Sequence, residues 1–316
     1  MNPHTYRGMA GAGSAMLMVG TLTAVSATIS GYPIFGGQAV RYAVAAVLLY
    51  AAVVISERGF PGLPSRRDLL LLAALAGTGL AAFNVCIVAA TEDTSPATIG
   101  TVIATVPVAL ALVGPLLERR RPAPPVVLAA CVVTAGAALA NGLGSGTLRG
   151  LLLALGALAG EVCFSLLAVP LLPRLGPLRV SAYSAALAAP MLLLIGLAAD
   201  GLGVLRVPTG AELAGFAYLA VVVTTVAFFL WYDALGRLGT DRTGLFAGLI
   251  PISAVITTVV LGLGAPAPAD LAGAALVGAG VVLGMLSNAP RPASPAPQQA
   301  QPLRSRAKPD SSEARI

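Results

Sequence analysis

Long apolar runs separated by short polar segments make up nearly the whole chain. A helix needs roughly 20 apolar residues to cross the hydrocarbon core of a bilayer, which is about 30 Å thick. Ten runs approach that length, at residues 12–31, 36–56, 69–90, 96–117, 124–141, 149–169, 178–199, 213–235, 242–263 and 269–287. Glycine and proline inside them do not exclude helices, because membrane helices tolerate both. The pattern predicts an all-α integral membrane protein with ten transmembrane helices.

The second half of the chain repeats the spacing of the first. Glycine and proline positions recur 144 residues later, with Gly100, Pro107, Pro122, Pro124 and Gly136 matching Gly244, Pro251, Pro266, Pro268 and Gly280. The pair Ala82-Phe83 recurs as Ala227-Phe228 at an offset of 145, so one residue was gained or lost between the third and fourth runs. Five spans per half is an odd number, and the second copy must enter the membrane from the opposite side. We expect two inverted five-helix repeats, residues 1–144 and 145–288, with a solute site between them.

Composition agrees with a membrane location. The chain is 57% hydrophobic and 10% charged, with a mean hydropathy of +0.88. Too few ionisable groups are present to coat a soluble particle. Residues 289–316 are different, being rich in Pro, Ser, Ala, Gln and Arg, and we expect a disordered cytoplasmic tail there. Its basic residues either contact anionic membrane lipids or only help to keep this end of the chain in the cytoplasm.

The basic residues fix an orientation. If the N-terminus is cytoplasmic, 16 of the 19 Lys and Arg residues fall in cytoplasmic segments, and only Arg149 and Arg206 fall outside. Arg41 lies within a span. The positive-inside rule therefore supports ten spans with both termini in the cytoplasm. We expect a multi-pass protein of the cell (plasma) membrane.

Several segments resemble a known transporter family. Pro107 in ATVPVALALVGPLLERRRP and Pro251 in GLIPISAVITTVVLG resemble its proline early in the fourth and ninth spans. LAACVVTAGAAL and LAGAALVGAGVVLG are similar to its small-residue fifth and tenth spans, and GGQAVRYAVAAVLL to its second span with an arginine. Over residues 12 to 288 the chain thus resembles the EamA family of the drug/metabolite transporter superfamily. The family's acidic residue at the end of the fourth span is present as Glu118, but its counterpart in the ninth span is missing.

The resemblance implies a secondary transporter that exports small metabolites by alternating access, with amino acids or related compounds expected first and amphipathic drugs second. Pro107 and Pro251 are the expected structural hinges. Two further classes stay open, a membrane-embedded enzyme and a lipid-handling or purely structural membrane protein. The enzyme is disfavoured, because no cluster of acids or histidines supplies a catalytic centre.

Glu161 is the most unusual polar residue of the spans. It lies about 13 residues into the sixth run, roughly 18 Å along a helix, too deep for its short side chain to reach either surface. Burial disfavours the charged carboxylate, so we expect Glu161 to take up and release protons at physiological pH, as the site of proton coupling. Alternatively it is a protonated structural acid bonded to a neighbouring helix.

Arg41 and Asn84 are the polar candidates of the first half. Arg41 lies near the outer end of the second run, where it either extends to the headgroups, neutralises Glu161, or grips a solute carboxylate in two-point geometry. Asn84 in the third run either lines the solute site or bonds a neighbouring helix. We include both among the substrate-binding residues.

Trp231 and Tyr183 complete the expected substrate-binding set with Arg41, Asn84 and Glu161. Trp231 with Tyr232 is alternatively an aromatic anchor at the cytoplasmic interface. Tyr183 with its neighbour Ser184 is placed to line a cavity, although serine in membrane helices often bonds its own backbone.

Other chemistry is sparse. His4 is the single histidine, and Cys86, Cys131 and Cys163 lie in separate spans without metal-ligand spacing, so we expect no metal and no His-based catalysis. No phosphate-binding glycine loop of the Walker type is found, so we expect no cofactor and no direct use of ATP. The expected partners are a small-molecule solute, membrane lipids and protons, not nucleic acid, in a monomer or homodimer.

Overall fold

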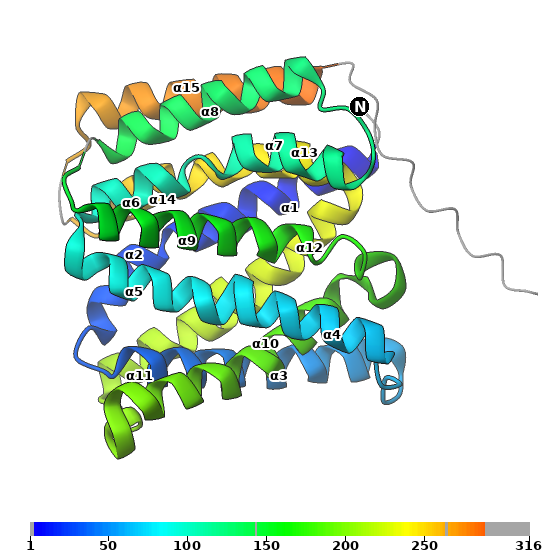
Figure 1. The fold of residues 1–316 in the computed structure, drawn as a ribbon, viewed down its shortest axis with the longest axis vertical. Coiled ribbons are helices and arrows are strands. Elements are labelled where there is room, and N and C mark those ends of the chain that lie inside the picture. Colours follow the sequence, from blue (N-terminus) through cyan, green and yellow to red (C-terminus); the bar gives the residue numbers. More distant parts are fainter. Residues whose placement is uncertain (1–2, 143, 263–264, 288–316) are drawn as a thin grey trace, which may run out of the picture.

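The structure is a computed structural model that describes residues 3–142, 144–262 and 265–287. In these ranges the chain forms helices and no strand, apart from an isolated bridge between Thr94 and Gly146. The helices lie side by side with their axes roughly in one direction (Figure 1). The expected tail at residues 289–316 falls outside the described residues.

The first half contains elements that are mostly long and apolar. They are α1 (Pro3–Gly20), α2 (Leu22–Ser26), η1 (Ala27–Ile29), α3 (Ile34–Glu57), α4 (Arg66–Leu75), η2 (Ala76–Ala82), α5 (Phe83–Asp93), α6 (Pro96–Ile103), α7 (Val106–Leu117) and α8 (Pro124–Asn141). The second half follows a similar order. Its elements are α9 (Leu148–Leu166), α10 (Leu172–Asp200), η3 (Gly201–Val204), α11 (Gly210–Tyr218), η4 (Leu219–Val226), α12 (Ala227–Leu238), α13 (Thr240–Gly244), η5 (Leu245–Gly248), α14 (Leu249–Val260) and α15 (Pro268–Leu286).

Eight helical segments of the described chain are long and apolar enough to cross a membrane. They match the second to eighth and the tenth of the expected spans, with ends that differ by up to six residues. The first expected span is built differently, because α1 begins early with polar residues and gives way after Gly20 to the short α2 and η1. The ninth is divided into α13, η5 and α14, so it is not one continuous helix.

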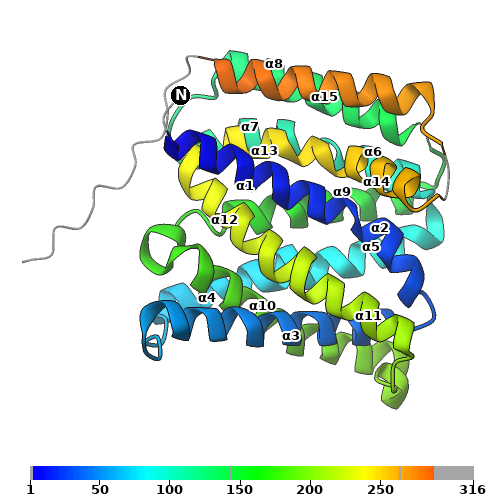
Figure 2. The same cartoon turned by 180° about the vertical axis from the view of Figure 1, so that it is seen from behind.

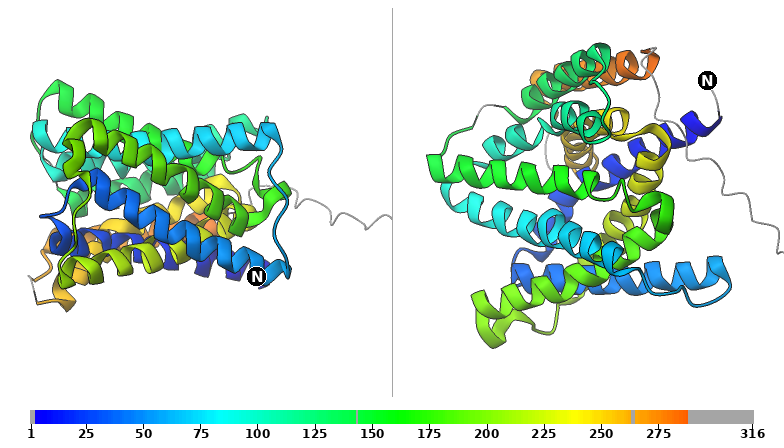
Figure 3. Two further views of the ribbon diagram at one scale, coloured as in Figure 1. Left: turned by 90° about the horizontal axis from the view of Figure 1, so that it is seen from below. Right: turned by 45° about the vertical axis from the view of Figure 1, so that its right-hand side comes forward.

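Two helix pairs form the outer edges of the bundle. The pair α8 and α15 lies at the upper edge of Figure 1, and the pair α3 and α10 at the lower edge, which the left view of Figure 3 shows from below. Small residues allow α8 and α15 to approach closely. A Cβ atom at Gly136 would meet the carbonyl oxygen of Gly273 at 2.7 Å, and one at Gly273 would meet that of Gly136 at 2.6 Å. Such backbone contact is the usual way in which membrane helices pack.

Between these edges, the first helix of each half packs against helices of the other half. Helix α1 of the first half packs against α12 and α14 of the second (Figure 2). Helix α9 of the second half packs correspondingly against η2, α5 and α6 of the first. Every wall in the middle of the bundle is therefore built from both halves of the chain.

Two kinds of helix irregularity occur at corresponding places. The third and eighth helices each contain a π-helical segment, η2 and η4, which ends beside the repeated Ala-Phe pair. The fourth helix is interrupted at Ala104 and Thr105, before Pro107, and the ninth is wound as the 3₁₀ segment η5 before Pro251. Short π and 3₁₀ segments inside helices are frequent at functional sites.

Candidate functional site

A cavity of about 560 Å³ lies between the two halves. Its walls come from α1, α3, η2, α5 and α6 of the first half and from α9, η4, α12 and α14 of the second, among other elements. The polar side chains on these walls include Ser30, Gln38, Arg41, Asn84, Thr91 and Glu161. The remaining lining is largely apolar or aromatic. Ligand sites in proteins commonly combine an apolar cavity with a few polar groups in this way.

The cavity is open at one end of the bundle and closed at the other. Ser30, in the segment before α3, and Thr91, near the end of α5, are both exposed and line its mouth. Toward the opposite end residues Thr240 to Thr243 are each at most 3% exposed. A solute would therefore reach the middle of the protein from one side.

Arg41 is buried in the protein, only 6% exposed, and does not extend to the headgroups as one expectation had it. Its Nε donates a hydrogen bond to Thr224 Oγ1 at 2.6 Å, and its Nη1 donates to Gln38 Oε1 at 3.3 Å. The guanidinium also lies 5.3 Å from the centre of the Tyr42 ring. Hydrogen bonds and an aromatic face reduce the free-energy cost of holding this cation away from water.

Glu161 lies in α9 and is partly buried against the cavity. Its carboxyl group makes no hydrogen bond or ion pair with any residue of the described ranges. The structure therefore offers no partner for the role of a structural hydrogen bond that was one interpretation of the sequence. Helix α9 comes close because Gly160 packs against Thr78 and Phe83 of the third helix, where a Cβ atom would meet the Thr78 carbonyl oxygen at 2.9 Å.

Arg41 and Glu161 line the same cavity without forming an ion pair within 4.0 Å in the described structure. The expected alternative in which Arg41 neutralises Glu161 is thus not found. Asn84 also lines the cavity; its Nδ2 donates to the Leu80 carbonyl oxygen at 2.7 Å, within its own helix.

Trp231 also lines the cavity, and is 2% exposed, while its neighbour Tyr232 is fully buried. The anchor interpretation is wrong for both, because they are buried inside the bundle, where Trp231 contacts Ser165 and Tyr232 contacts Phe164 of α9. Trp231 Nε1 donates to Ser165 Oγ at 3.1 Å. Tyr183 is placed elsewhere: it is not among the lining residues and lies on α10 near the ion pair of Arg179 with Glu57.

The expected hinges lie close to the cavity. Pro107 is buried in the first turn of α7, just after the interruption of the fourth helix. Pro251 is partly buried near the start of α14, next to the lining residue Ile250. Both prolines follow a stretch of irregular backbone. Proline has no backbone N–H, so it fits at such an interruption without removing a hydrogen bond from a regular helix.

Sequence reasoning missed several lining residues. Phe83 and Phe228 were noticed only as markers of the repeat, yet both face the cavity. Phe228 lies 4.9 Å from Phe164 and 6.1 Å from Tyr42, measured between ring centres. Thr224, which is not a lining residue but accepts the hydrogen bond from Arg41 Nε, was missed too, although two adjacent threonines in the apolar run VVVTTVAFF were a usable signal.

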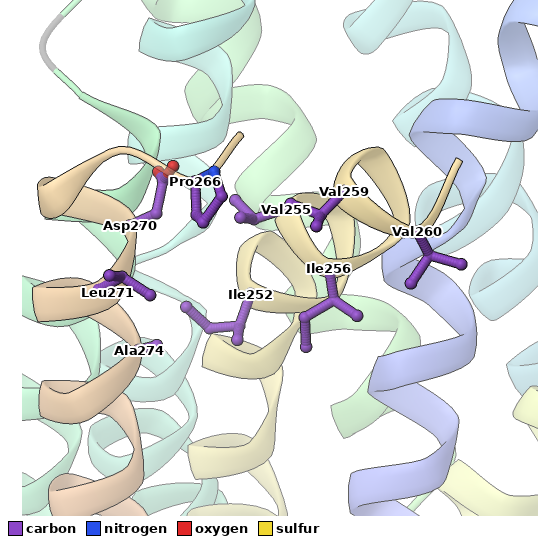
Figure 4. A pocket seen from close by; sticks show the side chains of 9 residues that line it. All are labelled: Ile252, Val255, Ile256, Val259, Val260, Pro266, Asp270, Leu271 and Ala274. Atoms are coloured by element: carbon purple, nitrogen blue, oxygen red, sulfur yellow. The ribbon is translucent and has the colours of Figure 1, made fainter. Parts of the chain in front are cut away.

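A second pocket of about 350 Å³ lies between α14 and α15 (Figure 4). Apart from Asp270 its lining is apolar, with Ile252, Ile256 and Leu271 among the residues. The Asp270 carboxylate accepts a hydrogen bond from the backbone N–H of Ala267 at 2.7 Å and so caps the N-terminus of α15. This groove suits lipid chains better than a polar solute. Within the described ranges no group of three His, Cys, Asp or Glu residues is placed to hold a metal ion.

Ion pairs cluster at the two ends of the bundle. At the closed end Arg120 contacts Glu118 at 2.7 Å and Asp241 at 3.3 Å, and Arg174 contacts Asp68 at 2.8 Å. The pair of Arg179 and Glu57 joins α10 to α3 at the same end. At the open end Arg149 pairs with Asp93. Apart from the pair of Arg120 with Glu118, which lies within the first half, these contacts link the first half of the chain to the second.

Comparison with known proteins agrees with this architecture. The profile of the EamA-like transporter family matches residues 7–142 and again residues 148–286, and the chain belongs to this family. The uncharacterized transporter YetK of Bacillus subtilis (strain 168) is 26% identical over 256 residues, covering 78% of this chain and 77% of YetK. A solved crystal structure that is 20% identical shares the fold, with a TM-score of 0.72 over 90% of this chain and 97% of the other. The protein is therefore a multi-span membrane permease, and its class implies a small-molecule solute.

Proposed function

We propose that the protein is a secondary transporter of zwitterionic metabolites, amino acids or their relatives, that works by alternating access. The observation that carries the proposal is that Arg41 from the first half and Glu161 from the second line one cavity without pairing with each other. A guanidinium suits a carboxylate and a carboxylate suits an ammonium group, so a zwitterion would satisfy both charges at once.

The proposed topology has ten crossings in two inverted repeats, residues 1–144 and 145–288. Support comes from contacts that recur at an offset of 145. Arg149 Nη1 lies 4.0 Å from Glu92 Oε2, and Arg237 Nη1 lies 2.9 Å from His4 Nδ1. His4 corresponds to Arg149, and Glu92 to Arg237. The same contact between first and third helices of opposite halves thus occurs at the two ends of the bundle, as an inverted repeat requires.

With both termini in the cytoplasm of the cell, the open mouth of the cavity faces outward, and the end with Arg120 and Asp241 faces inward. We propose that Pro107 and Pro251 act as hinges for the change to the inward-open form. We further propose export as the direction and proton exchange at Glu161 as the coupling, because Glu161 is the carboxyl group among the cavity-lining residues.

The test is solute flux in proteoliposomes with amino acids and with their amides, which lack the carboxylate. We expect wild type to prefer the acids, and Arg41→Ala and Asn84→Ala to weaken binding about tenfold or more while the protein elutes from gel filtration as wild type. If both variants bind acids like wild type, the solute site lies elsewhere.

A multidrug exporter is the second candidate, favoured by the aromatic walls of Phe83, Phe164, Phe228 and Trp231. Such walls stack on flat apolar compounds and on organic cations. An amphipathic cation needs no guanidinium, so its transport would be unchanged or improved in Arg41→Ala. That outcome, with no flux of amino acids, would replace the first proposal by the second.

A further inference from the structure

We propose that Thr224 is the positioning residue of the solute site. It holds the Arg41 guanidinium by Nε, so that the edge formed by the two terminal nitrogens is the one presented to a solute carboxylate. The inference rests on the proposed function, in which Arg41 binds that carboxylate. Its support is the local geometry of the π-helical segment η4.

The Thr224 hydroxyl oxygen can act only as a hydrogen-bond acceptor toward Arg41. It is fully buried, and its single proton is donated to the Leu219 carbonyl oxygen at 2.9 Å. The hydroxyl oxygen then has only lone pairs to offer to another group. Arg41 Nε, an obligate donor, meets it at 2.6 Å. The chain of bonds from Arg41 to Thr224 to Leu219 therefore has one direction and fixes the side chain.

The π-helical winding supplies this arrangement. In the α-helix α14, Thr257 donates to the Ser253 carbonyl oxygen, four residues earlier, at 2.8 Å. In η4, Thr224 and Thr225 donate instead to the carbonyl five residues earlier. The two neighbours thus make the same backbone bond, but only Thr224 receives Arg41. Thr225 is a matched control provided by the chain itself.

The bond to Thr224 restricts how a carboxylate can approach. A guanidinium offers two edges for two-point binding, a side edge that includes Nε and an end edge formed by the two terminal nitrogens. Thr224 occupies the side edge. Nη1 makes a long contact of 3.3 Å to Gln38, and Nη2 has no hydrogen-bond partner in the described part of the chain. The end edge therefore remains for the solute.

The corresponding position in the first half has a different use. Thr224 matches Gly79 in η2 at the offset of 145, and a Cβ atom at Gly79 would meet Phe164 Cα at 2.8 Å. One π-helical segment thus admits α9, which bears Glu161, and the other holds Arg41. The two charges of the site are placed by the same backbone irregularity in the two repeats.

The first test measures the hydrogen bond between Arg41 Nε and Thr224 in the absence of solute. Protein labelled with ¹⁵N at arginine Nε is compared by NMR in detergent, and the Arg41 signal is identified by its loss in Arg41→Lys. We expect solvent exchange of the Arg41 Nε proton to be at least tenfold faster in Thr224→Val than in wild type, unchanged in Thr225→Val, and restored in Thr224→Ser. An unchanged signal in Thr224→Val overturns the inference.

The second test uses L-phenylalanine and L-phenylalaninamide, which differ in the carboxylate and suit the aromatic walls. We expect Thr224→Val to raise the KM for the acid about tenfold, to leave the maximal rate within twofold, and to abolish the preference for acid over amide. Thr225→Val should match wild type and Thr224→Ser should recover the preference.

The two arms separate the possible failures. Retained acid preference in Thr224→Val, together with its loss in Arg41→Ala, overturns the positioning role alone. Retained acid preference in Arg41→Ala overturns the proposed function, whatever the NMR signal does. Altered exchange of the Nε proton together with lost acid preference supports both.

Discussion

The guanidinium of Arg120, in the segment after α7, lies 3.3 Å from the carboxylate of Asp241 at the start of α13 and so ties the two halves of the chain together. Partial burial alone would lower the pKa of Arg120, but the carboxylates of Glu118 and Asp241 raise it above its ordinary value. Arg120 therefore stays charged at any working pH. The contact should respond to charge removal and not to pH.

Removal of this contact should open the closed end. Arg120→Ala leaves the Asp241 carboxylate, 3% exposed, without its partner across the halves, and an uncompensated buried charge is strongly destabilising. We expect hydrogen–deuterium exchange of the peptide containing residues 240–244 to increase severalfold, as measured by mass spectrometry. Arg121→Ala, which removes an exposed arginine next to it, is the control. Exchange that is equal in both variants would show that the contact does not hold the end closed.

The substitution Glu161→Gln should separate solute exchange across the membrane from transport coupled to protons. Glutamine resembles the protonated carboxyl group but cannot release a proton. In proteoliposomes we expect the variant to retain exchange of solute across the membrane and to lose transport driven by an imposed pH gradient. Wild-type flux that ignores the gradient rejects proton coupling, and gradient-driven flux that persists in Glu161→Gln assigns the coupling to another group.

The proposed orientation can be tested by cysteine labelling in intact cells, after Cys86, Cys131 and Cys163 are replaced by serine or alanine. We expect an impermeant maleimide to label Glu92→Cys, at a side chain that is 68% exposed, and to label Arg121→Cys only after the membrane is permeabilised. The reverse pattern would invert the topology and make the cavity mouth cytoplasmic.

Two glycines of α15 should behave oppositely on substitution by alanine. Gly273 faces α8, where a Cβ atom would meet the Gly136 carbonyl oxygen at 2.6 Å, and we expect Gly273→Ala to destabilise the protein by about 1–3 kcal/mol. Gly278 has no atom within 4 Å of its Cβ position, so Gly278→Ala should stabilise the helix by roughly 0.5–1 kcal/mol. The midpoint of denaturation in mixed detergent measures both, and equal midpoints would contradict the packing.

Sequence periodicity located the helices better than it located the site. The expected span 124–141 coincides with α8, because Pro124 begins the helix and Gly142 follows its end. The ninth span was expected as one helix, since a run of apolar residues does not reveal where backbone winding changes. The same limit concealed η2 and η4: their residues are as apolar as the α-helical turns beside them.

For the site, depth along the helix selected Glu161, because an ionisable residue far from both surfaces is costly and stands out in an apolar run. Arg41, nearer the outer end of its run, was selected for its charge and for its resemblance to the family's arginine. Asn84 and Trp231 also reach the cavity, whereas Tyr183 does not. Tyr183 and Trp231 are both aromatic residues in apolar runs, but α10 contributes no lining residue whereas α12 contributes Ala227, Phe228 and Trp231. The place of each helix in the bundle depends on packing between distant segments and cannot be read from local composition.

The winding of η4 has a consequence for how the chain can change over time. A π-helical turn contains one residue more than the α-helical turn that it replaces. Five residues of a π-helical turn therefore cover about the same angle as four residues of an α-helix. Deletion of a single residue within Leu219–Val226 would let the helix continue as an α-helix with Trp231 still on the cavity wall, but it could remove the five-residue spacing between Leu219 and Thr224. Loss of one residue elsewhere in the eighth helix would instead rotate everything after it by about 100° and take Trp231 off that wall.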